Sequence, residues 1–140
     1  KNISLHRLNP RAVALEADAL APPPLRMQNF DLIACNPPYI TEEECQALDT
    51  SVRDWEPMLA LDGGEDGLVF YRSVLQNWKS VLKDGGWIIF EVGEGQAADV
   101  RALLLEAGFH NLGCTLDTLG TERVIYAQKK KPIPTDSEEM

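Results

Sequence analysis

The stretch of the chain best suited to chemistry is Asn36-Pro37-Pro38-Tyr39, which follows an apolar run of strand character. Proline has no N–H group and a fixed φ, and it pushes the preceding residue out of the α region. Two successive prolines therefore end a strand and hold the next backbone segment extended, with its carbonyls free to accept hydrogen bonds. With an amide on one side and an aromatic ring on the other, this loop suits binding a flat group that carries an NH2. The alternative is a strand followed by a rigid loop without chemistry.

Two acids are expected at the same edge of the fold as this loop. Apolar or alternating runs predict strands at 11–17, 30–35 and 87–92, the second of them apolar enough to be buried on both faces. Asp18 follows the first run, Asn36 the second, and Glu91 lies near the end of the third. Ligands bind beyond the carboxyl ends of strands in open α/β sheets, so the three side chains are expected to gather there.

The remaining elements are predicted from helical spacing, caps and turn residues. They are the end of a helix at 1–9, a helical turn at 41–44, helices at 68–82 and 97–107, and strands at 109–116 and 123–128. Thr41 can cap its turn, and Gly85-Gly86 is expected to close the helix before it in a left-handed conformation. Strands alternating with helices predict an α/β fold with a parallel sheet. The long connection 41–67 is of a kind that is often functional.

Composition excludes several classes of function. The 140 residues suit one domain, and 13 basic against 22 acidic residues give a net charge of -9, which argues against a broad nucleic-acid surface. No stretch is apolar enough to span a bilayer, and the first residues lack the apolar core of a signal peptide. The three cysteines show no Cys-x-x-Cys spacing, so no disulfide framework, zinc site or other metal site is expected. We therefore expect a cytoplasmic protein without membrane association.

The combined motifs resemble one family, the HemK-type glutamine methyltransferases of peptide chain release factors. The matching segments are Asn36-Pro37-Pro38-Tyr39-Ile40, Trp55-Glu56-Pro57, Ala60-Leu61-Asp62-Gly63-Gly64, Asp66-Gly67-Leu68, Tyr71-Arg72, Glu91-Val92-Gly93, Gln96 and Thr121-Glu122-Arg123-Val124. They occur in the family's order and spacing, and the resemblance covers the chain from about Asn2 to Gln128. It implies the Rossmann-like fold of class I S-adenosylmethionine-dependent methyltransferases.

The resemblance also implies a reaction and a set of ligands. S-adenosylmethionine would be the methyl donor, and the acceptor would be the side-chain amide of the glutamine in a release factor's Gly-Gly-Gln loop. Asp18 would bind the adenine amino group of the cofactor with Ala19 beside it, and Asn36 would face both ligands. Glu56-Pro57 would shape the substrate side together with Pro38 and the Gly63-Gly64 loop. Without the resemblance, Asp18 is equally well a turn or cap residue, and Glu91 an exposed acid at a strand end.

The implied reaction agrees with the physical needs of amide methylation. An amide nitrogen is a poor nucleophile because its lone pair is delocalised into the neighbouring π-system. Two acceptors, the Asn36 side-chain oxygen and the Pro37 carbonyl, could take one N–H each and favour a pyramidal nitrogen. Tyr39 could pack on the flat amide and fix its plane. The rate gain would then come from positioning and electrostatic complementarity, with no metal or covalent nucleophile.

The chain departs from the family at its beginning. The family's first strand, its Gly-rich loop for the methionine end of the cofactor and the acid after its second strand are not found, nor is its helical domain. The expected fold is therefore an incomplete one: residues 1–128 form the C-terminal part of a catalytic domain and 129–140 a disordered tail. With the neighbouring strands missing, we expect the chain either to pair its open sheet edge with a second copy or to leave residues 1–20 poorly ordered. Weak binding of S-adenosylmethionine, if any, is expected for this chain alone.

Two other functions remain open at this point. One is methylation of an exocyclic amine of adenine or guanine in a nucleic acid, which needs the base exposed or flipped out. The other is a catalytically silent piece of the fold that acts only through interactions. The acidic charge balance and the loop from Glu56-Pro57 to Asp66-Gly67 favour the release factor as partner, with no direct contact to nucleic acid.

Overall fold

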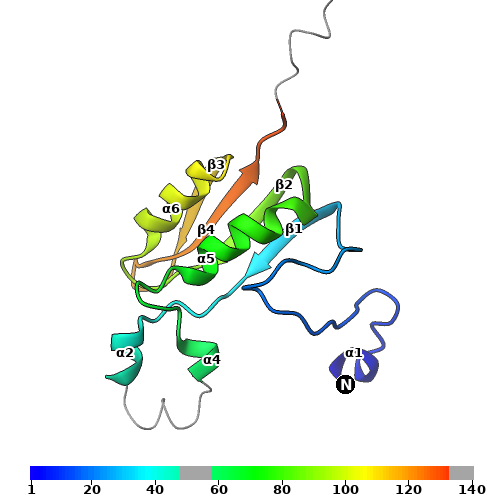
Figure 1. Cartoon of the computed structure of the whole chain (residues 1–140), viewed down its shortest axis with the longest axis horizontal. Helices are drawn as coiled ribbons and strands as arrows, with labels where there is room; N and C mark the ends of the chain where they lie inside the picture. The colour runs from blue at the N-terminus through cyan, green and yellow to red at the C-terminus, as the bar shows by residue number, and fades with distance from the viewer. Residues whose placement is uncertain (48–57, 133–140) are drawn as a thin grey trace, which may run out of the picture.

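A four-stranded sheet with the order β1-β2-β4-β3 forms the centre of the computed structural model, which describes residues 1–47 and 58–132 (Figure 1). The strands are β1 (Phe30–Cys35), β2 (Leu82–Glu91), β3 (Phe109–Leu116) and β4 (Glu122–Lys129). β1 and β2 are parallel, whereas β4 runs antiparallel to both of its neighbours, β2 and β3. The predicted α/β class is thus confirmed. The sheet is mixed rather than wholly parallel, and its four strands fit part of a Rossmann-like sheet.

Helices connect the strands and cover one face of this sheet. A helical stretch between β1 and β2 has three forms in succession: α5 (Val69–Ser73), the π-helix η1 (Val74–Trp78) and the 3-10 helix η2 (Lys79–Val81). The helix α6 (Ala97–Glu106) connects β2 to β3 and lies beside α5 (Figure 1). The predicted helices at 68–82 and 97–107 are therefore confirmed, apart from their end residues.

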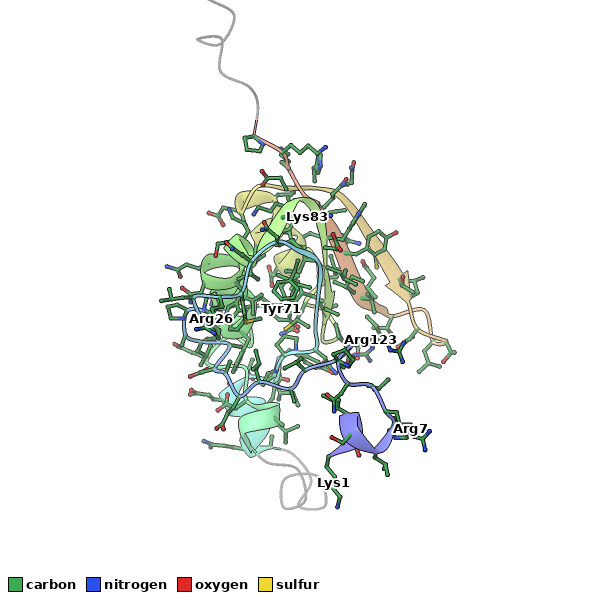
Figure 2. All side chains as sticks on the ribbon, turned by 90° about the vertical axis from the view of Figure 1, so that its right-hand side faces the viewer. Lys1, Arg7, Arg26, Tyr71, Lys83 and Arg123 are labelled. Atoms are coloured by element: carbon green, nitrogen blue, oxygen red, sulfur yellow. The ribbon has the colours of Figure 1, made fainter. Side chains whose placement is uncertain are left out.

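The hydrophobic core lies between these helices and the sheet. Tyr71 of α5 and Phe90 of β2 are fully buried and meet edge to face, with ring centroids 5.1 Å apart. Figure 2 shows Tyr71 near the middle of the molecule. Further buried members come from each layer: Val74, Leu75, Ile88, Val100, Leu104, Phe109, Ile125 and Ala127. On the opposite face of the sheet, Trp87 and Tyr126 contact each other and are each 36% exposed.

Two predictions about strands are wrong. β1 is not buried on both faces, since Phe30 is 43% and Leu32 50% exposed. The reason is its place at the edge of the sheet, where it pairs with β2 alone among the described strands. Residues 11–17 form no strand at all, and Val13 and Leu15 are 74% and 64% exposed. Alternating apolar and polar residues suit the surface of a half-buried sheet. Without a neighbouring strand to pair with, such a segment forms no β-structure.

The glycine pair before β2 does not cap the helix as predicted. The helical stretch ends at Val81 and β2 begins at Leu82. Phe30 pairs with Leu82 but Leu32 pairs with Trp87, so residues 83–86 form an irregularity inside the strand. Gly85, with a φ of 81°, supplies the left-handed residue of this irregularity. The predicted conformation is thus present, but in the strand rather than at the helix end.

The short helices lie outside the sheet layer. They are α1 (Asn2–Leu5), α2 (Glu42–Gln46) and α4 (Met58–Leu61). Thr41 caps α2 as predicted, its hydroxyl oxygen accepting the Glu44 N–H at 3.1 Å. Among the helices of the described residues, none is long and apolar enough to cross a membrane. Residues 1–47 and 58–132 also contain no cluster of three or more His, Cys, Asp or Glu side chains suited to a metal ion.

Candidate active site

The Asn36-Pro37-Pro38-Tyr39 loop leaves the carboxyl end of β1 and is fastened at once to a second segment. Ile40 forms a parallel bridge with Asp62. The Ile40 N–H donates to the Leu61 carbonyl at 3.2 Å, and the Gly63 N–H donates to the Ile40 carbonyl at 2.7 Å. These bonds fix the end of the loop, so its two prolines span a short distance between a strand and a bridge.

Glycines allow the backbone to pack closely around the loop. A Cβ atom on Gly63 would lie 2.7 Å from the Pro38 carbonyl oxygen and 2.8 Å from the Tyr39 Cα. A Cβ atom on Gly93, just after β2, would lie 2.7 Å from Cδ2 of the Tyr39 ring. Such separations are too short for any side chain, so both positions require glycine. Gly63 thus lets its segment lie close to the backbone of Pro38 and Tyr39.

Gln96 joins two loops through hydrogen bonds, a role that the sequence does not predict. Its Nε2 donates to the Tyr39 carbonyl at 2.8 Å, and its Oε1 accepts the Gly93 N–H at 2.8 Å. One amide side chain therefore joins the loop after β1 to the loop after β2. The available signal in the sequence is the spacing Gly93-x-x-Gln96 directly after a strand, and the family resemblance includes Gln96 without giving it a role.

Tyr39 points its hydroxyl group at Glu91, the acid predicted to lie beside the loop. The Tyr39 hydroxyl donates to Glu91 Oε1 at 3.4 Å, and the Tyr71 hydroxyl donates to the Glu91 carbonyl at 2.7 Å. Burial, followed by the negative charge of Glu91, raises the pKa of Tyr39 above its ordinary value. The phenol is therefore protonated at neutral pH and acts as a donor, which holds the ring beside the prolines.

The hydrogen bonds of the loop leave two acceptors open. The carbonyls of Tyr39 and Ile40 are used by Gln96 and Gly63. Within residues 1–47 and 58–132, neither the Asn36 side chain nor the Pro37 carbonyl has a hydrogen-bond partner. Asn36 is exposed, and Pro37 is buried. These are the two acceptors that amide methylation would need.

Two cavities meet at the loop. The larger, of about 660 Å³, is lined by residues 17–20, Asn36, Pro38, Ala60 and Phe70. The smaller, of about 320 Å³, is lined by residues 36–40, Ala60, Leu61 and Glu91. Asn36 and Pro38 border both cavities. The predicted cofactor residues Asp18, Ala19 and Asn36 thus share one cavity, and Asn36, Pro37, Pro38 and Tyr39 share the other.

Asp18 reaches the larger cavity on irregular backbone instead of at a strand end. Its Oδ1 accepts the Leu20 N–H at 2.8 Å, and its carbonyl accepts the Ala21 N–H at 3.0 Å. Asp18 therefore has the turn-forming role that its type favours and also lines the cavity. Glu56 and Pro57, predicted to shape the substrate side, lie outside the described residues.

Two residues near the site have other roles. Burial raises the pKa of the Cys35 thiol to about 11, so the thiol is protonated at neutral pH. Arg123 donates from Nε to Asp117 Oδ2 at 3.0 Å, and its carbonyl accepts the Val92 N–H at 2.8 Å. It joins the turn before β4 to the end of β2.

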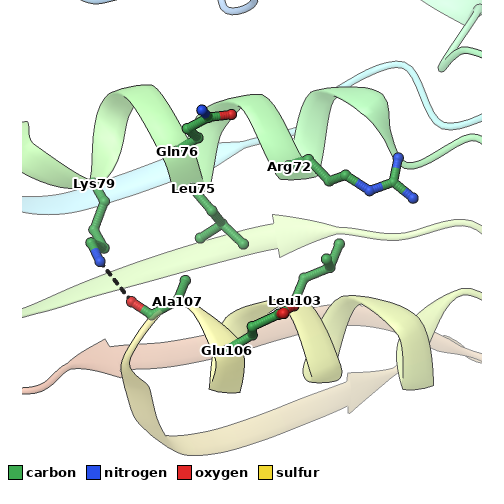
Figure 3. Close-up of a pocket in the computed structure, with 7 residues that line it drawn as sticks. All are labelled: Arg72, Leu75, Gln76, Lys79, Leu103, Glu106 and Ala107. Atoms are coloured by element: carbon green, nitrogen blue, oxygen red, sulfur yellow. Dashed lines mark hydrogen bonds between the residues drawn. The ribbon is translucent and has the colours of Figure 1, made fainter.

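A third cavity, of about 360 Å³, lies between the helical stretch α5–η2 and α6, away from the loop (Figure 3). Lys79 crosses it and donates to the Ala107 carbonyl at 2.8 Å. Arg72 at its other end forms an ion pair with Asp66. None of the predicted site residues lines this cavity.

Comparison with known proteins finds several relatives that share one protein name. No family model matches the chain. A release factor glutamine methyltransferase from Clostridium botulinum is 43% identical over 129 residues, which cover 92% of this chain and 46% of the relative. An enzyme of the same name from Geobacter sulfurreducens is 44% identical over 102 residues, covering 73% of this chain and 36% of the relative. The chain spans about half the length of the curated relatives it matches, or less.

Among solved structures, similarity is found to a release-factor-specific protein-(glutamine-N5) methyltransferase from Alicyclobacillus acidocaldarius. It is 27% identical, the match covers 74% of this chain and 50% of that one, and the TM-score is 0.45. The relationship to a family therefore rests on the sequence identities.

Proposed function

We propose that the protein containing this chain methylates a glutamine side-chain amide in the Gly-Gly-Gln loop of a peptide chain release factor. The reason is that the chain belongs to the family of release factor glutamine methyltransferases. The methyl donor is S-adenosylmethionine. The observation that carries the proposal is the position of Asn36, which borders both a larger and a smaller cavity. An amide side chain between two cavities can contact a donor in one and an acceptor in the other.

The larger cavity has the chemistry that the adenosine part of the cofactor needs. Its walls are mostly apolar, from Ala19, Leu20, Pro38 and Phe70, with the carboxylate of Asp18 at one side. Apolar walls suit a flat heterocycle, and a carboxylate accepts hydrogen bonds from an exocyclic NH2. Asp18, Ala19 and Asn36 would hold the cofactor here. When bound, S-adenosylmethionine supplies an electrophilic methyl group.

The loop residues prepare the acceptor nitrogen. The Asn36 side-chain oxygen and the Pro37 carbonyl each accept one N–H of the glutamine amide, which localises the nitrogen lone pair. The Tyr39 ring packs on the amide plane and is kept in place by the bond from its hydroxyl to Glu91. Because Gln96 and Gly63 hold the loop before substrate arrives, these acceptors need little reorganisation during the reaction. Pro38, Glu56 and Pro57 are proposed to line the path of the release factor.

The experiment that tests this function offers three acceptors in parallel. The full-length protein that contains residues 1–140 is incubated with S-adenosylmethionine labelled in its methyl group and with release factor, DNA or RNA. Label is expected in the release factor, on one glutamine, and absent from both nucleic acids. Label in DNA or RNA alone would instead support methylation of an exocyclic base amine.

Two further expectations accompany this function. Residues 1–128 are proposed as part of the catalytic domain, and its last strand, β4, extends one residue further, to Lys129, which the sequence had placed in the tail. Residues 130–140 remain proposed as the tail, of which 133–140 lie outside the described residues. The outer edge of β1 is proposed to pair with a second copy when the chain is studied alone, because among the described strands only β2 pairs with it. Light scattering that finds only monomer at high concentration would contradict this self-association.

A further inference from the structure

Residues 17–20 of the segment 17–21 line the larger cavity, although the segment belongs to no helix or strand. Asp18 organises its turn through bonds to the N–H groups of Leu20 and Ala21. A turn of this kind fixes its own shape but not its place relative to the rest of the molecule. A binding segment with irregular backbone must therefore be held from outside.

Two side chains of the helical stretch between β1 and β2 hold it. The Ser73 hydroxyl donates to the Ala19 carbonyl at 2.9 Å. The Trp78 indole Nε1 donates to the Ala21 carbonyl, also at 2.9 Å. Asn77 donates from Nδ2 to the Ser73 oxygen at 3.2 Å, which leaves the Ser73 hydrogen free for Ala19. The two bonds join residues 54 and 57 positions apart in the sequence, and both hold carbonyls of the turn that begins at Asp18.

The π-helix η1 explains how both side chains can face the same segment. Ser73 immediately precedes η1 and Trp78 is its last residue. In an α-helix, successive residues differ by about 100° around the axis, so residues five apart differ by about 140° and point to different sides. A π-helix joins residues i and i+5 and brings them to one side. The wider turn thus aligns the serine and the tryptophan on the carbonyls of Ala19 and Ala21.

We propose that Ser73 and Trp78 are positioning residues for the methyl donor, acting through the segment 17–21, and that η1 sets their common orientation. This inference rests on the proposed function, because the donor is assigned to the larger cavity. The two side chains do not line that cavity themselves. They fix the positions of the Asp18 carboxylate and the Ala19 backbone. They therefore affect the affinity for the methyl donor and not the rate of methyl transfer.

Kinetics of two variants test this role in the full-length protein. Trp78→Phe removes the indole N–H and keeps an aromatic ring, and Ser73→Ala removes the hydroxyl group. Each is expected to raise KM for S-adenosylmethionine on the order of fivefold, the usual effect of one lost hydrogen bond. Both should leave kcat and KM for the release factor within about twofold of the unaltered protein. Trp87→Phe, at a half-exposed tryptophan on the opposite face of the sheet, is the matched control and should change none of these constants.

Hydrogen exchange in the absence of cofactor provides a second measurement that does not depend on activity. The amides of Leu20 and Ala21 are expected to exchange faster in Trp78→Phe and Ser73→Ala than in the unaltered protein, while core strand β2 keeps its protection. Unchanged KM for the donor with unchanged exchange would overturn the proposal, as would an equal fall of kcat and both affinities. If the unaltered protein transfers no methyl group, the proposed function fails, while faster exchange at Leu20 and Ala21 still supports the tether.

Discussion

The two sides of the candidate site are built in different ways. The acceptor loop, residues 36–40, is held by main-chain bonds to 61–63, by the Gln96 amide and by two glycines that admit no side chain. The donor segment, residues 17–21, is held by its own turn and by two side-chain bonds from Ser73 and Trp78. Close backbone packing fixes the first, and a pair of side-chain tethers fixes the second.

This difference predicts how each side responds to change. A substitution in the acceptor loop removes an atom that takes part in the reaction or forces the backbone to move. A substitution in the donor segment weakens the hydrogen bonds that hold its turn, but the chain can still adopt that turn. The largest effects on the reaction with the release factor should therefore come from Asn36 and Gly63, and graded effects on donor affinity from residues 17–21.

The largest effect is expected for Asn36→Ala. The variant removes one of the two acceptors proposed for the glutamine amide, so kcat should fall on the order of 10²–10³-fold, as for loss of one preorganised group in other sites. Methyl transfer to release factor measures it, and circular dichroism checks that the fold is retained. Asn2→Ala, at an exposed position in α1, is the matched control. Activity within about twofold of the unaltered protein would remove Asn36 from the mechanism.

Gly63→Ala comes next, because the added Cβ would contact only backbone atoms, at 2.7 Å from the Pro38 oxygen and 2.8 Å from the Tyr39 Cα. The loop must shift, which should lower kcat/KM for the release factor on the order of 10-fold and destabilise the protein by about 1–3 kcal/mol. Denaturant titration and initial rates measure the two effects. Ala98→Ser, which adds one atom to an exposed position of α6, controls for the larger side chain. Full activity in Gly63→Ala would show that the loop is less constrained than its contacts indicate.

The smallest effect is expected for Tyr39→Phe, which keeps the ring and removes the hydroxyl bond to Glu91. The activity should fall by about threefold.

The raised pKa of Tyr39 adds a pH dependence, since the folded chain favours the neutral phenol. That contribution to stability is complete below the ordinary tyrosine pKa of about 10 and is lost as the pH rises through the higher folded value. In a titration of tyrosinate absorbance, the difference between the unaltered protein and Tyr39→Phe should have its midpoint above 10, and a midpoint at or below 10 would contradict the burial of this ring.

The end of β1 and the loop after it could be predicted because the signals are local, while the role of this loop toward an acceptor stays a prediction. Asn36-Pro37-Pro38-Tyr39 ends a strand for reasons contained in the residues themselves, and β1 is found where that motif requires it. Glu91 could be placed beside it because the ends of β1 and β2 lie at one edge of the sheet. The bracing by Gln96 was missed because a hydrogen bond across 57 positions leaves no periodic signal.

The donor side could be predicted only in part. The resemblance assigned Asp18 and Ala19 to the cofactor, and the structure places both in one cavity with Asn36. The strand expected before Asp18 was wrong, because alternation at residues 11–17 does not supply a neighbour for pairing. The tethers from Ser73 and Trp78 depend on the π-helix η1, whose wider turn is not visible in the helical spacing of apolar residues.

The assignment of donor and acceptor to separate cavities is tested most directly by two-substrate kinetics of Asp18→Ala and Gly63→Ala in the full-length protein. The account predicts opposite outcomes. Asp18→Ala should raise KM for S-adenosylmethionine on the order of 10-fold and leave KM for the release factor unchanged. Gly63→Ala should raise KM for the release factor and change the donor KM less, because Pro38, whose carbonyl the added Cβ meets, borders both cavities. If both variants raise both KM values together, the two cavities do not separate donor from acceptor, and the assignment of the site is wrong.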